Sequence, residues 1–218
     1  MSNSNEEKVY KARKKLRTNW IFEQFTLPNP KTGEPIRTEA SIEHDYVLKA
    51  FFTPSIQHIS TDIDSINSES QNRRYTGDIR IFDEGEGFSY IDCKDSKSML
   101  RQKNIDKFDA LAEEFDDAGS KLDVVTDKQI RSGYLITNYK RFYIYLSMPR
   151  PQDSHIKTII ECVESRLRIT LGELRALMTE KSINMRTIWY CLAHQIIRTN
   201  LEIYITSKSI LWSKNHAI

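Results

Sequence analysis

The stretch TGDIRIFDEGEGFSYIDCK, residues 76–94, decides the fold of this chain. Two mostly apolar, β-rich runs flank its glycine-containing turn EGEG, a pattern that is typical of an antiparallel hairpin. If the turn is symmetric about its middle, Asp78 lies opposite Cys93 or Lys94. Asp92 and Lys94 are two residues apart, so they share one face of their strand. The stretch therefore predicts a small sheet with two carboxylates and one ammonium gathered at one end.

The composition is that of a folded, water-soluble protein. The chain has 218 residues, of which 39% are hydrophobic and 28% charged, enough for one domain of ordinary size and a smaller second one. The formal net charge is only +2, so any contact with nucleic acid must come from local patches. Three scattered cysteines without a CxxC pair argue for a reducing compartment and against a zinc site. Because no signal core or membrane-length apolar run is visible, we expect a cytoplasmic protein.

The segments around the hairpin alternate between helical and extended patterns. The predicted elements are a helix over 38–52, a strand over 57–66, a loop over 65–72, a helix over 98–117 and a strand over 122–126. Pro54 stops the first helix, and Gly119 ends the second. This order predicts an α/β domain in which helices flank a mixed sheet.

The composition changes between residues 130 and 152, where a segment rich in Tyr, Ile and Phe is interrupted by Pro149-Arg150-Pro151. We interpret residues 134–146 as a boundary segment or an extra pair of strands. Three predicted helices and a hairpin of residues 201–205 and 210–212 follow, the order of a winged helix-turn-helix. The predicted division is a basic N-terminal arm and loop over 1–34, a first domain over 35–150 and a second over 151–218.

The charged residues of the hairpin have the chemistry of a divalent-ion site. Mg²⁺ takes oxygen ligands, which Asp78, Asp92 and the carbonyl of Cys93 can supply. Such an ion neutralises a phosphate and lowers the pKa of an attacking water. The Lys94 ammonium would orient that water or stabilise the developing negative charge. The pattern D-x₁₃-D-x-K is loose, and an edge hairpin with ordinary surface charges is the alternative.

Glu43 is a candidate for a third acid. Glu39 and Glu43 are four residues apart, so they share one face of the first predicted helix. Ile42 and Tyr46 flank Glu43 and should pack inward, which would let Glu43 project over the sheet edge. An exposed helix carboxylate is the simpler alternative.

Basic side chains supply candidate contacts to a phosphate backbone. The candidates are Lys97, Arg101, Lys103, Arg186 and Lys208. The first three begin the second predicted helix, where a solvated helix start explains them equally well. Arg186 lies with Thr187 and Tyr190 on the third helix of the second domain, and Lys208 on its wing. The apolar residues 210–212 can instead anchor a protein partner, and the basic residues of 6–17 form either a solvated helix or an arm along DNA.

Taken together, these motifs resemble those of the PD-(D/E)xK nuclease superfamily and, more narrowly, of the TnsA-type endonuclease subunit of heteromeric cut-and-paste transposons. Residues 39–46 (EASIEHDY) are similar to the helix motif of that family, in which serine, an apolar residue and glutamate precede an aspartate–aromatic pair. Residues 75–79 (YTGDI) are similar to its Y-T-P-D strand start, and 91–94 (IDCK) to its acid-x-lysine strand. Gly77 stands where the proline usually does. Asp92 is the superfamily acid, although some TnsA-type members carry an amide there.

The resemblance implies a metal-dependent DNA endonuclease with a restriction-endonuclease-like sheet and a C-terminal winged helix. Glu43, Asp78 and Asp92 would hold one or two Mg²⁺ ions, for which Mn²⁺ can substitute, and Lys94 would be the catalytic lysine. TnsA-type subunits cut the non-transferred strand at the 5′ ends of the transposon. A TnsB-type DDE transposase cuts and joins the 3′ ends, and a TnsC-type AAA+ regulator controls the target. The implied setting is transposon-end DNA in a bacterial cytoplasm.

Other functions stay open. A stand-alone restriction or repair nuclease would cut linear DNA without partners. A non-catalytic DNA-binding assembly module would keep its function after Asp78→Ala, and a transcription regulator built on the winged helix would not need the acids. The sequence leaves undecided the transposon-end sequence, the choice of target by a site-specific protein or a guide RNA complex, the oligomeric state, the number of metals and whether the winged helix binds DNA or protein.

Overall fold

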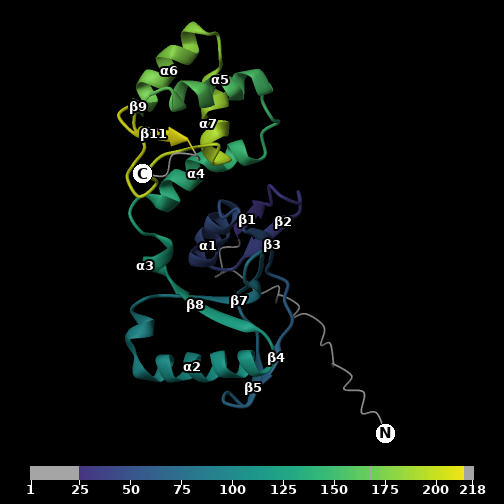
Figure 1. The fold of residues 1–218 in the computed structure, drawn as a ribbon. Coiled ribbons are helices and arrows are strands. Elements are labelled where there is room, and N and C mark those ends of the chain that lie inside the picture. The colour runs from purple at the N-terminus through teal and green to yellow at the C-terminus, as the bar shows by residue number, and fades with distance from the viewer. Residues whose placement is uncertain (1–24, 167, 214–218) are drawn as a thin grey trace. The chain divides into compact units, whose positions relative to one another are not determined.

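The computed structural model describes residues 25–166 and 168–213 and divides the chain into two compact units (Figure 1). Unit 1 runs over Met1–Gln129 and unit 2 over Ile130–Ile218. The expected basic arm of residues 6–17 lies outside the described residues. Among the residues that are described, no helix is both long and apolar enough to cross a membrane.

Unit 1 is built on a four-stranded sheet in the order β3-β6-β7-β8. The strands are β3 (Ile56–Ser60), β6 (Ile79–Asp83), β7 (Gly87–Lys94) and β8 (Lys121–Thr126). β6 pairs antiparallel with β3 and with β7, as expected for a hairpin, whereas β8 runs parallel to β7. The parallel pair arises because the chain crosses back through α2 (Gln102–Asp117) before it enters β8. The predicted mixed sheet is confirmed.

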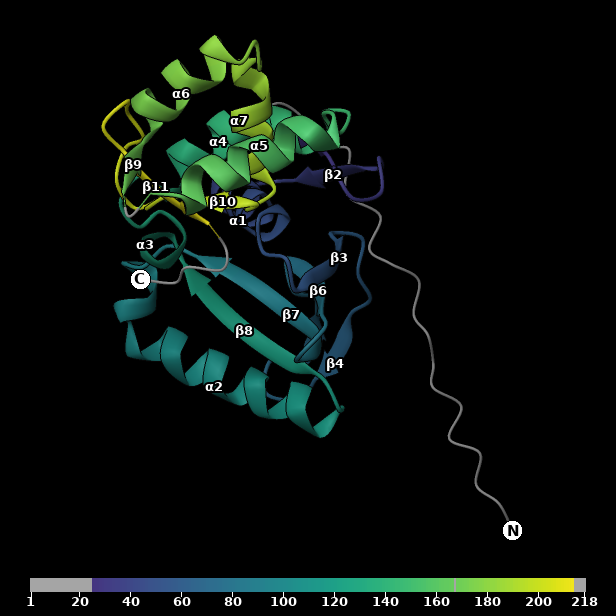
Figure 2. The same ribbon diagram turned by 45° about the horizontal axis from the view of Figure 1, so that its top comes forward.

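Helices flank this sheet on both faces (Figures 1 and 2). On the face of α2, the ring of Tyr90 on β7 lies 4.9 Å from that of Phe115. Side chains alternate along a strand, so Ile91 and Cys93 point to the opposite face, where α1 (Ser41–Phe51) contacts β7. The same alternation puts Asp92 on the α2 face with Tyr90.

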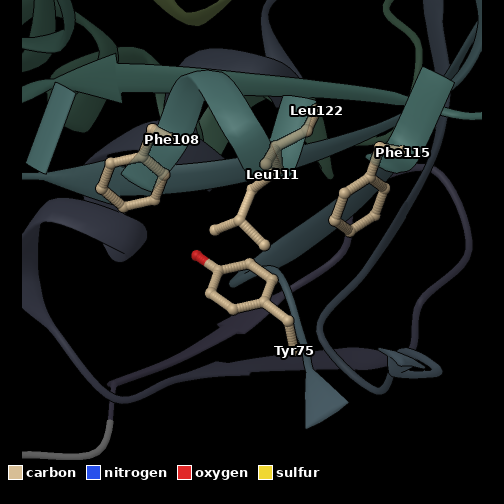
Figure 3. Packing of buried hydrophobic residues seen from close by; sticks show 5 residues of the cluster. All are labelled: Tyr75, Phe108, Leu111, Phe115 and Leu122. Atoms are coloured by element: carbon tan, nitrogen blue, oxygen red, sulfur yellow. The ribbon is translucent and has the colours of Figure 1, made fainter. Parts of the chain in front are cut away.

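The core between α2 and the sheet explains why this segment is helical. Phe108, Leu111 and Phe115 recur three and four residues apart, so they form one apolar stripe along α2. They pack with Leu122 of β8 and Tyr75, and all five side chains are buried (Figure 3). Burial of this stripe fixes the height of α2 above the strand that carries Asp92.

Two short hairpins and two short helices complete unit 1. They are β1 (Phe25–Pro28) with β2 (Pro35–Thr38), β4 (Ile66–Ser68) with β5 (Arg73–Tyr75), η1 (Ser98–Leu100) and α3 (Asp127–Ile130). The prediction of a loop over residues 65–72 was therefore wrong for β4. Ile66 packs against the core under α2, and this contact orders a segment whose own sequence is polar.

Unit 2 contains four helices and a three-stranded sheet among its described residues. The helices are α4 (Leu135–Leu146), α5 (Asp153–Glu164), α6 (Leu171–Glu180) and α7 (Met185–Ala193), and the strands are β9 (Ile169–Thr170), β10 (Ile197–Arg198) and β11 (Ile210–Ser213). β11 lies between the other two strands and pairs antiparallel with both. Helix α7 contacts α4, α5 and α6, so it is the central helix of this unit.

Two features of unit 2 differ from the sequence prediction. Residues 134–146 form α4 rather than a boundary segment or strands. The cause is packing on α7, because the ring centroids of Phe142 and Tyr145 lie 5.8 and 6.2 Å from that of Trp189. The division of the chain accordingly precedes α4 instead of following residue 150. The strand predicted over residues 201–205 is not formed, and β10 pairs with β11 in its place.

Candidate active site

Three of the predicted site residues meet where β6 begins and β7 ends. The Lys94 ammonium donates to Asp78 Oδ2 at 3.1 Å and forms an ion pair with Asp92 Oδ1. The backbone N–H of Cys93 donates to the same Asp78 oxygen at 2.8 Å. The expected gathering of two carboxylates and one ammonium at one end of the sheet is therefore present.

The register of the hairpin differs by one or two residues from the prediction that Asp78 faces Cys93 or Lys94. Ile79 pairs with Ile91, and the N–H of Asp78 donates to the carbonyl of Ile91 at 2.9 Å. The predicted register was wrong because it assumed a turn symmetric about its middle.

The length of the turn explains this shift. Asp83 pairs with Gly87, which leaves a three-residue loop between the strands. Gly87 has a φ of +82°, a conformation that costs glycine little, and Asp83 Oδ1 accepts from the N–H of Gly85 at 2.9 Å. Three-residue loops that end in a left-handed residue are common hairpin connections. As a result, Asp78 lies level with Asp92, and the two carboxylates are closer than predicted.

Asp92 is held in an almost fully buried position. It is 1% exposed, and its second oxygen accepts from the hydroxyl of Tyr75. Burial raises the pKa of Asp92 to about 7, and the attraction of Lys107 opposes this rise. Because the charged form of a buried carboxylate is costly, it gains more from a neighbouring cation than an exposed carboxylate does.

Glu43 lies in the first turn of α1 and is partly buried. Its Oε2 accepts from the backbone N–H of Glu39 at 2.9 Å, which fixes the side chain at the start of the helix. Burial raises the pKa of Glu43, and the negative charge of Asp78 raises it further. Glu43 in turn raises the pKa of Asp92, so the three carboxylates lie within electrostatic reach of one another.

Cys93 lies between the two site residues of β7 on the opposite face of the strand. Its thiol is buried, and burial together with the charge of Asp78 raises its pKa well above the ordinary range. The thiol therefore stays protonated at neutral pH. The carbonyl of Cys93, the backbone ligand expected from the sequence, accepts from the Lys94 ammonium at 3.3 Å.

The donor set fits a magnesium ion held by two carboxylates. Within residues 25–166 and 168–213, no group of three or more His, Cys, Asp or Glu side chains lies in metal-binding range. Mg²⁺ is commonly held by one or two carboxylates, with water and substrate phosphate as its other ligands. Asp78 and Asp92 converge on one ammonium, so their oxygens already share a cation, and both are the hard ligands that Mg²⁺ prefers.

The five basic residues predicted to contact DNA are all exposed. Lys97 directly precedes η1, Arg101 lies between η1 and α2, and Lys103 lies in the first turn of α2. Arg186 and Lys208 lie in unit 2. Their role as DNA contacts stays a prediction. Thr187 and Tyr190 were expected on the surface of the third helix, but both are buried. The expectation failed because α4 packs along α7 and covers that side.

Two residues near the carboxylates were missed as site residues by the sequence reasoning. Tyr75 was noted only as part of a motif, although its hydroxyl is bonded to Asp92. Lys107 of α2 interacts electrostatically with Asp92, Lys94 and Asp78. Its position next to Phe108, at the edge of the apolar stripe, was a signal that it lies over the sheet rather than in open solvent.

The site therefore consists of two carboxylates joined by a lysine, with a third carboxylate from the preceding helix nearby. No protein-family model matches the chain, and no curated protein matches it. What the protein does must accordingly follow from the geometry of this site and from the motifs that form it.

Proposed function

We propose that the chain is a metal-dependent DNA endonuclease. The observation that carries this proposal is the pair of carboxylates, Asp78 and Asp92, bonded to the single ammonium of Lys94 at the end of a mixed sheet. Phosphodiester hydrolysis needs a divalent ion, a water of lowered pKa and a cation for the developing charge. The two carboxylates would hold the ion that lowers the pKa of the water, and the lysine would be the cation for the developing charge. Their place on rigid strands fixes this geometry.

Within this class, we propose the strand-cleaving subunit of a heteromeric cut-and-paste transposon, similar to the TnsA type. Three motifs in order support this choice: residues 39–46, 75–79 and 91–94. The substrate would be the non-transferred strand at the 5′ end of the element. The partners would be a TnsB-type transposase, which cuts the other strand, and a TnsC-type regulator.

The finer description of the fold belongs to the same proposal. A restriction-endonuclease-like unit 1 is supported by helices on both faces of a mixed sheet and by acids at one sheet end. A winged-helix unit 2 is supported by the order of α5, β9, α6, α7, β10 and β11 and by the central place of β11 in the sheet. Thr187–Ala193 of α7 are all buried, so the part of this helix that is open to a DNA groove is its start, where Arg186 is exposed.

The proposed mechanism assigns one task to each side chain. Asp78 and Asp92 would hold Mg²⁺, which when bound neutralises the scissile phosphate and activates the attacking water. The N–H of Cys93 holds Asp78 in place, and the hydroxyl of Tyr75 does the same for Asp92. Lys94 keeps the two carboxylates together and places a positive charge beside the reacting phosphate.

Glu43 has a separate place in this mechanism. Its raised pKa makes it a better proton acceptor than an ordinary glutamate, and it stands near both Asp78 and Asp92. It can bind the ion through a water, or accept the proton that the attacking water loses.

The test is strand cleavage of a labelled transposon-end duplex in Mg²⁺, with and without the neighbouring transposase subunit. Wild type is compared with Asp78→Ala and Lys94→Ala, and Lys121→Met, at the far end of β8, is the control. We expect 5′-end cuts that need the partner and fall by a factor of about 10³ or more in both site variants. Partner-independent cutting would favour a stand-alone nuclease. Equal cutting by wild type and both site variants would overturn the proposal.

A further inference from the structure

Lys94 has no donor left over for a second acceptor. An ammonium has three N–H donors. In the structure, these are directed to Asp78, to Asp92 and to the carbonyl of Cys93. A DNA phosphate that approaches the carboxylates is attracted by the charge of Lys94 but receives no hydrogen bond from it unless one of these contacts is displaced. A free cationic donor must therefore come from another side chain.

Lys107 is placed to be that cation. Its ammonium lies 5.1 Å from the ring centroid of Tyr75 and 4.8 Å from that of Phe108, and Lys94 lies 5.7 Å from the same Phe108 ring. In Figure 3 the Tyr75 hydroxyl is directed toward the end of the cluster where Phe108 lies. That hydroxyl is bonded to Asp92, so Lys107 stands over the ring that supports the buried carboxylate.

The N–H donors of the Lys107 ammonium are also not used by any hydrogen bond among the described residues. Within the same residues Lys107 forms no ion pair with any acid, and its ammonium lies against the rings of Tyr75 and Phe108. Lys107 and Asp92 attract each other, which opposes the effect of burial on the pKa of each group. A cation held near a carboxylate, but not bonded to it, keeps its donors free for an incoming anion.

Arg73 adds a second positive charge on the same side. Arg73 and Tyr75 are two residues apart on β5, so both face α2. The ring of Tyr75, two residues from Arg73 on the same strand face, lies 5.1 Å from the Lys107 ammonium, which places the two cations on one side of the site. Burial lowers the pKa of Lys107, and the positive charges of Lys94 and Arg73 lower it further. Two like charges brought together repel, and an anion between them removes that cost.

We propose that Lys107 and Arg73 form a phosphate-binding site beside the carboxylates, which holds a phosphodiester of the DNA strand during cleavage. The inference rests on the proposed nuclease function and adds to it a cation supplied by α2. The ligand is recognised through its negative charge alone, so the site positions any DNA sequence equally. Lys107 and Arg73 are contacts to the substrate, and Tyr75 and Phe108 are the rigid surface that positions the Lys107 stem.

The experiment compares wild type with Lys107→Met and Arg73→Met in the assembled complex with the transposase subunit. Methionine retains most of the hydrocarbon stem against the rings and removes the charge. Lys107→Arg is the conservative variant, and Lys121→Met is the matched control because Lys121 lies at the opposite end of β8 and pairs with Glu86 and Asp123. The probe is a fluorescein-labelled transposon-end duplex, bound without divalent ion at several salt concentrations and cleaved in Mg²⁺.

We expect each methionine variant to lower the slope of log affinity against log salt by about one, as loss of one phosphate contact should. The kcat/KM for cleavage should fall about tenfold or more in Lys107→Met and recover in Lys107→Arg. Thermal unfolding of the variants should match that of Lys121→Met, which separates a binding role from a folding defect.

Either of two results would overturn the phosphate-binding site. Neither would by itself contradict the proposed nuclease function. A salt slope and kcat/KM for Lys107→Met equal to those of Lys121→Met would overturn the phosphate site, while Asp78→Ala could still be inactive. A kcat/KM loss in Lys107→Met that Lys107→Arg does not recover, with an unchanged salt slope, would show that Lys107 acts through packing and would equally overturn it.

Discussion

At the scale of single residues, the site depends on how Asp92 is kept in its buried position. Its carboxylate is 1% exposed and has two strong partners, the ammonium of Lys94 and the hydroxyl of Tyr75. Removal of either partner leaves an acceptor without compensation in a region from which water is excluded. Tyr75 therefore acts on the site through Asp92, as a positioning residue.

The variant Tyr75→Phe tests this role because it removes one hydroxyl and retains the ring in the core. We expect a loss of about 1–3 kcal/mol in the free energy of unfolding, since a buried charged acceptor loses a donor. Urea unfolding measures the loss, and Phe115→Leu is the control for a packing change in the same cluster. The cleavage rate of Tyr75→Phe should fall further than that of Phe115→Leu at equal stability. Equal rates for the two variants would contradict the positioning role.

At the scale of elements, the sequence predicted those features that depend on residues close together along the chain. The apolar stripe of α2, its end at Gly119 with a φ of +71° and the β6–β7 hairpin all follow from residue spacing and turn chemistry. The register was missed because it depends on the conformation of one glycine, Gly87. Helix α4 was missed because its Tyr-, Ile- and Phe-rich segment favours strands locally, whereas its packing on Trp189 selects a helix.

The residues of the candidate site were likewise predictable only where they lie close together along the chain. Asp78, Asp92 and Lys94 are found from the sequence because they lie on two strands joined by a short turn. Lys107 is brought near them by the crossover through α2. Its place beside Phe108 indicates that it lies over the sheet, but not that it lies near these three residues. Side chains that reach a site from another element require the packing to be known.

The start of α6 offers a pH test of local stability. Thr170 caps this helix: Glu173 N–H donates to its hydroxyl at 3.2 Å, and Glu173 Oε2 accepts from the Thr170 N–H at 2.7 Å. The backbone and hydroxyl donors of Thr170 hold the pKa of Glu173 below its ordinary value. The unfolded chain therefore binds this proton more tightly, and the stability that Glu173 contributes is lost as the pH falls below about 4.5 through the lower folded value.

Glu173→Gln isolates this effect, since glutamine retains the acceptor but does not titrate. We expect the difference in thermal midpoint between wild type and Glu173→Gln to shrink as the pH falls from 5 to 3, about the range in which a glutamate of lowered pKa takes up its proton. Circular dichroism measures the midpoint of each protein. Midpoints that fall in parallel over this range would contradict the assigned cap.

At the scale of the whole molecule, all the candidate catalytic residues lie in unit 1. Unit 1 carries the carboxylates, the lysine and the cations of α2 around one sheet. Unit 2 buries its central helix α7 and keeps Ile203, Tyr204 and Tyr134 exposed, with the two tyrosine rings 5.6 Å apart. Under the proposed function, a subunit that cuts one strand would act together with the protein that cuts the other.

The most direct measurement of the central claim is metal rescue at Asp78. Asp78→Cys replaces an oxygen ligand by sulfur, which Mg²⁺ binds poorly and Mn²⁺ or Cd²⁺ accepts more readily. Cleavage of the transposon-end duplex in the assembled complex should be lost by Asp78→Cys in Mg²⁺ and restored by the softer ions, while Asp78→Ala stays inactive in all of them. Cleavage by Asp78→Cys in Mg²⁺ at the wild-type rate, or wild-type cleavage that survives removal of divalent ions by a chelator, would contradict the assignment of Asp78 and Asp92 as metal-binding carboxylates of a nuclease.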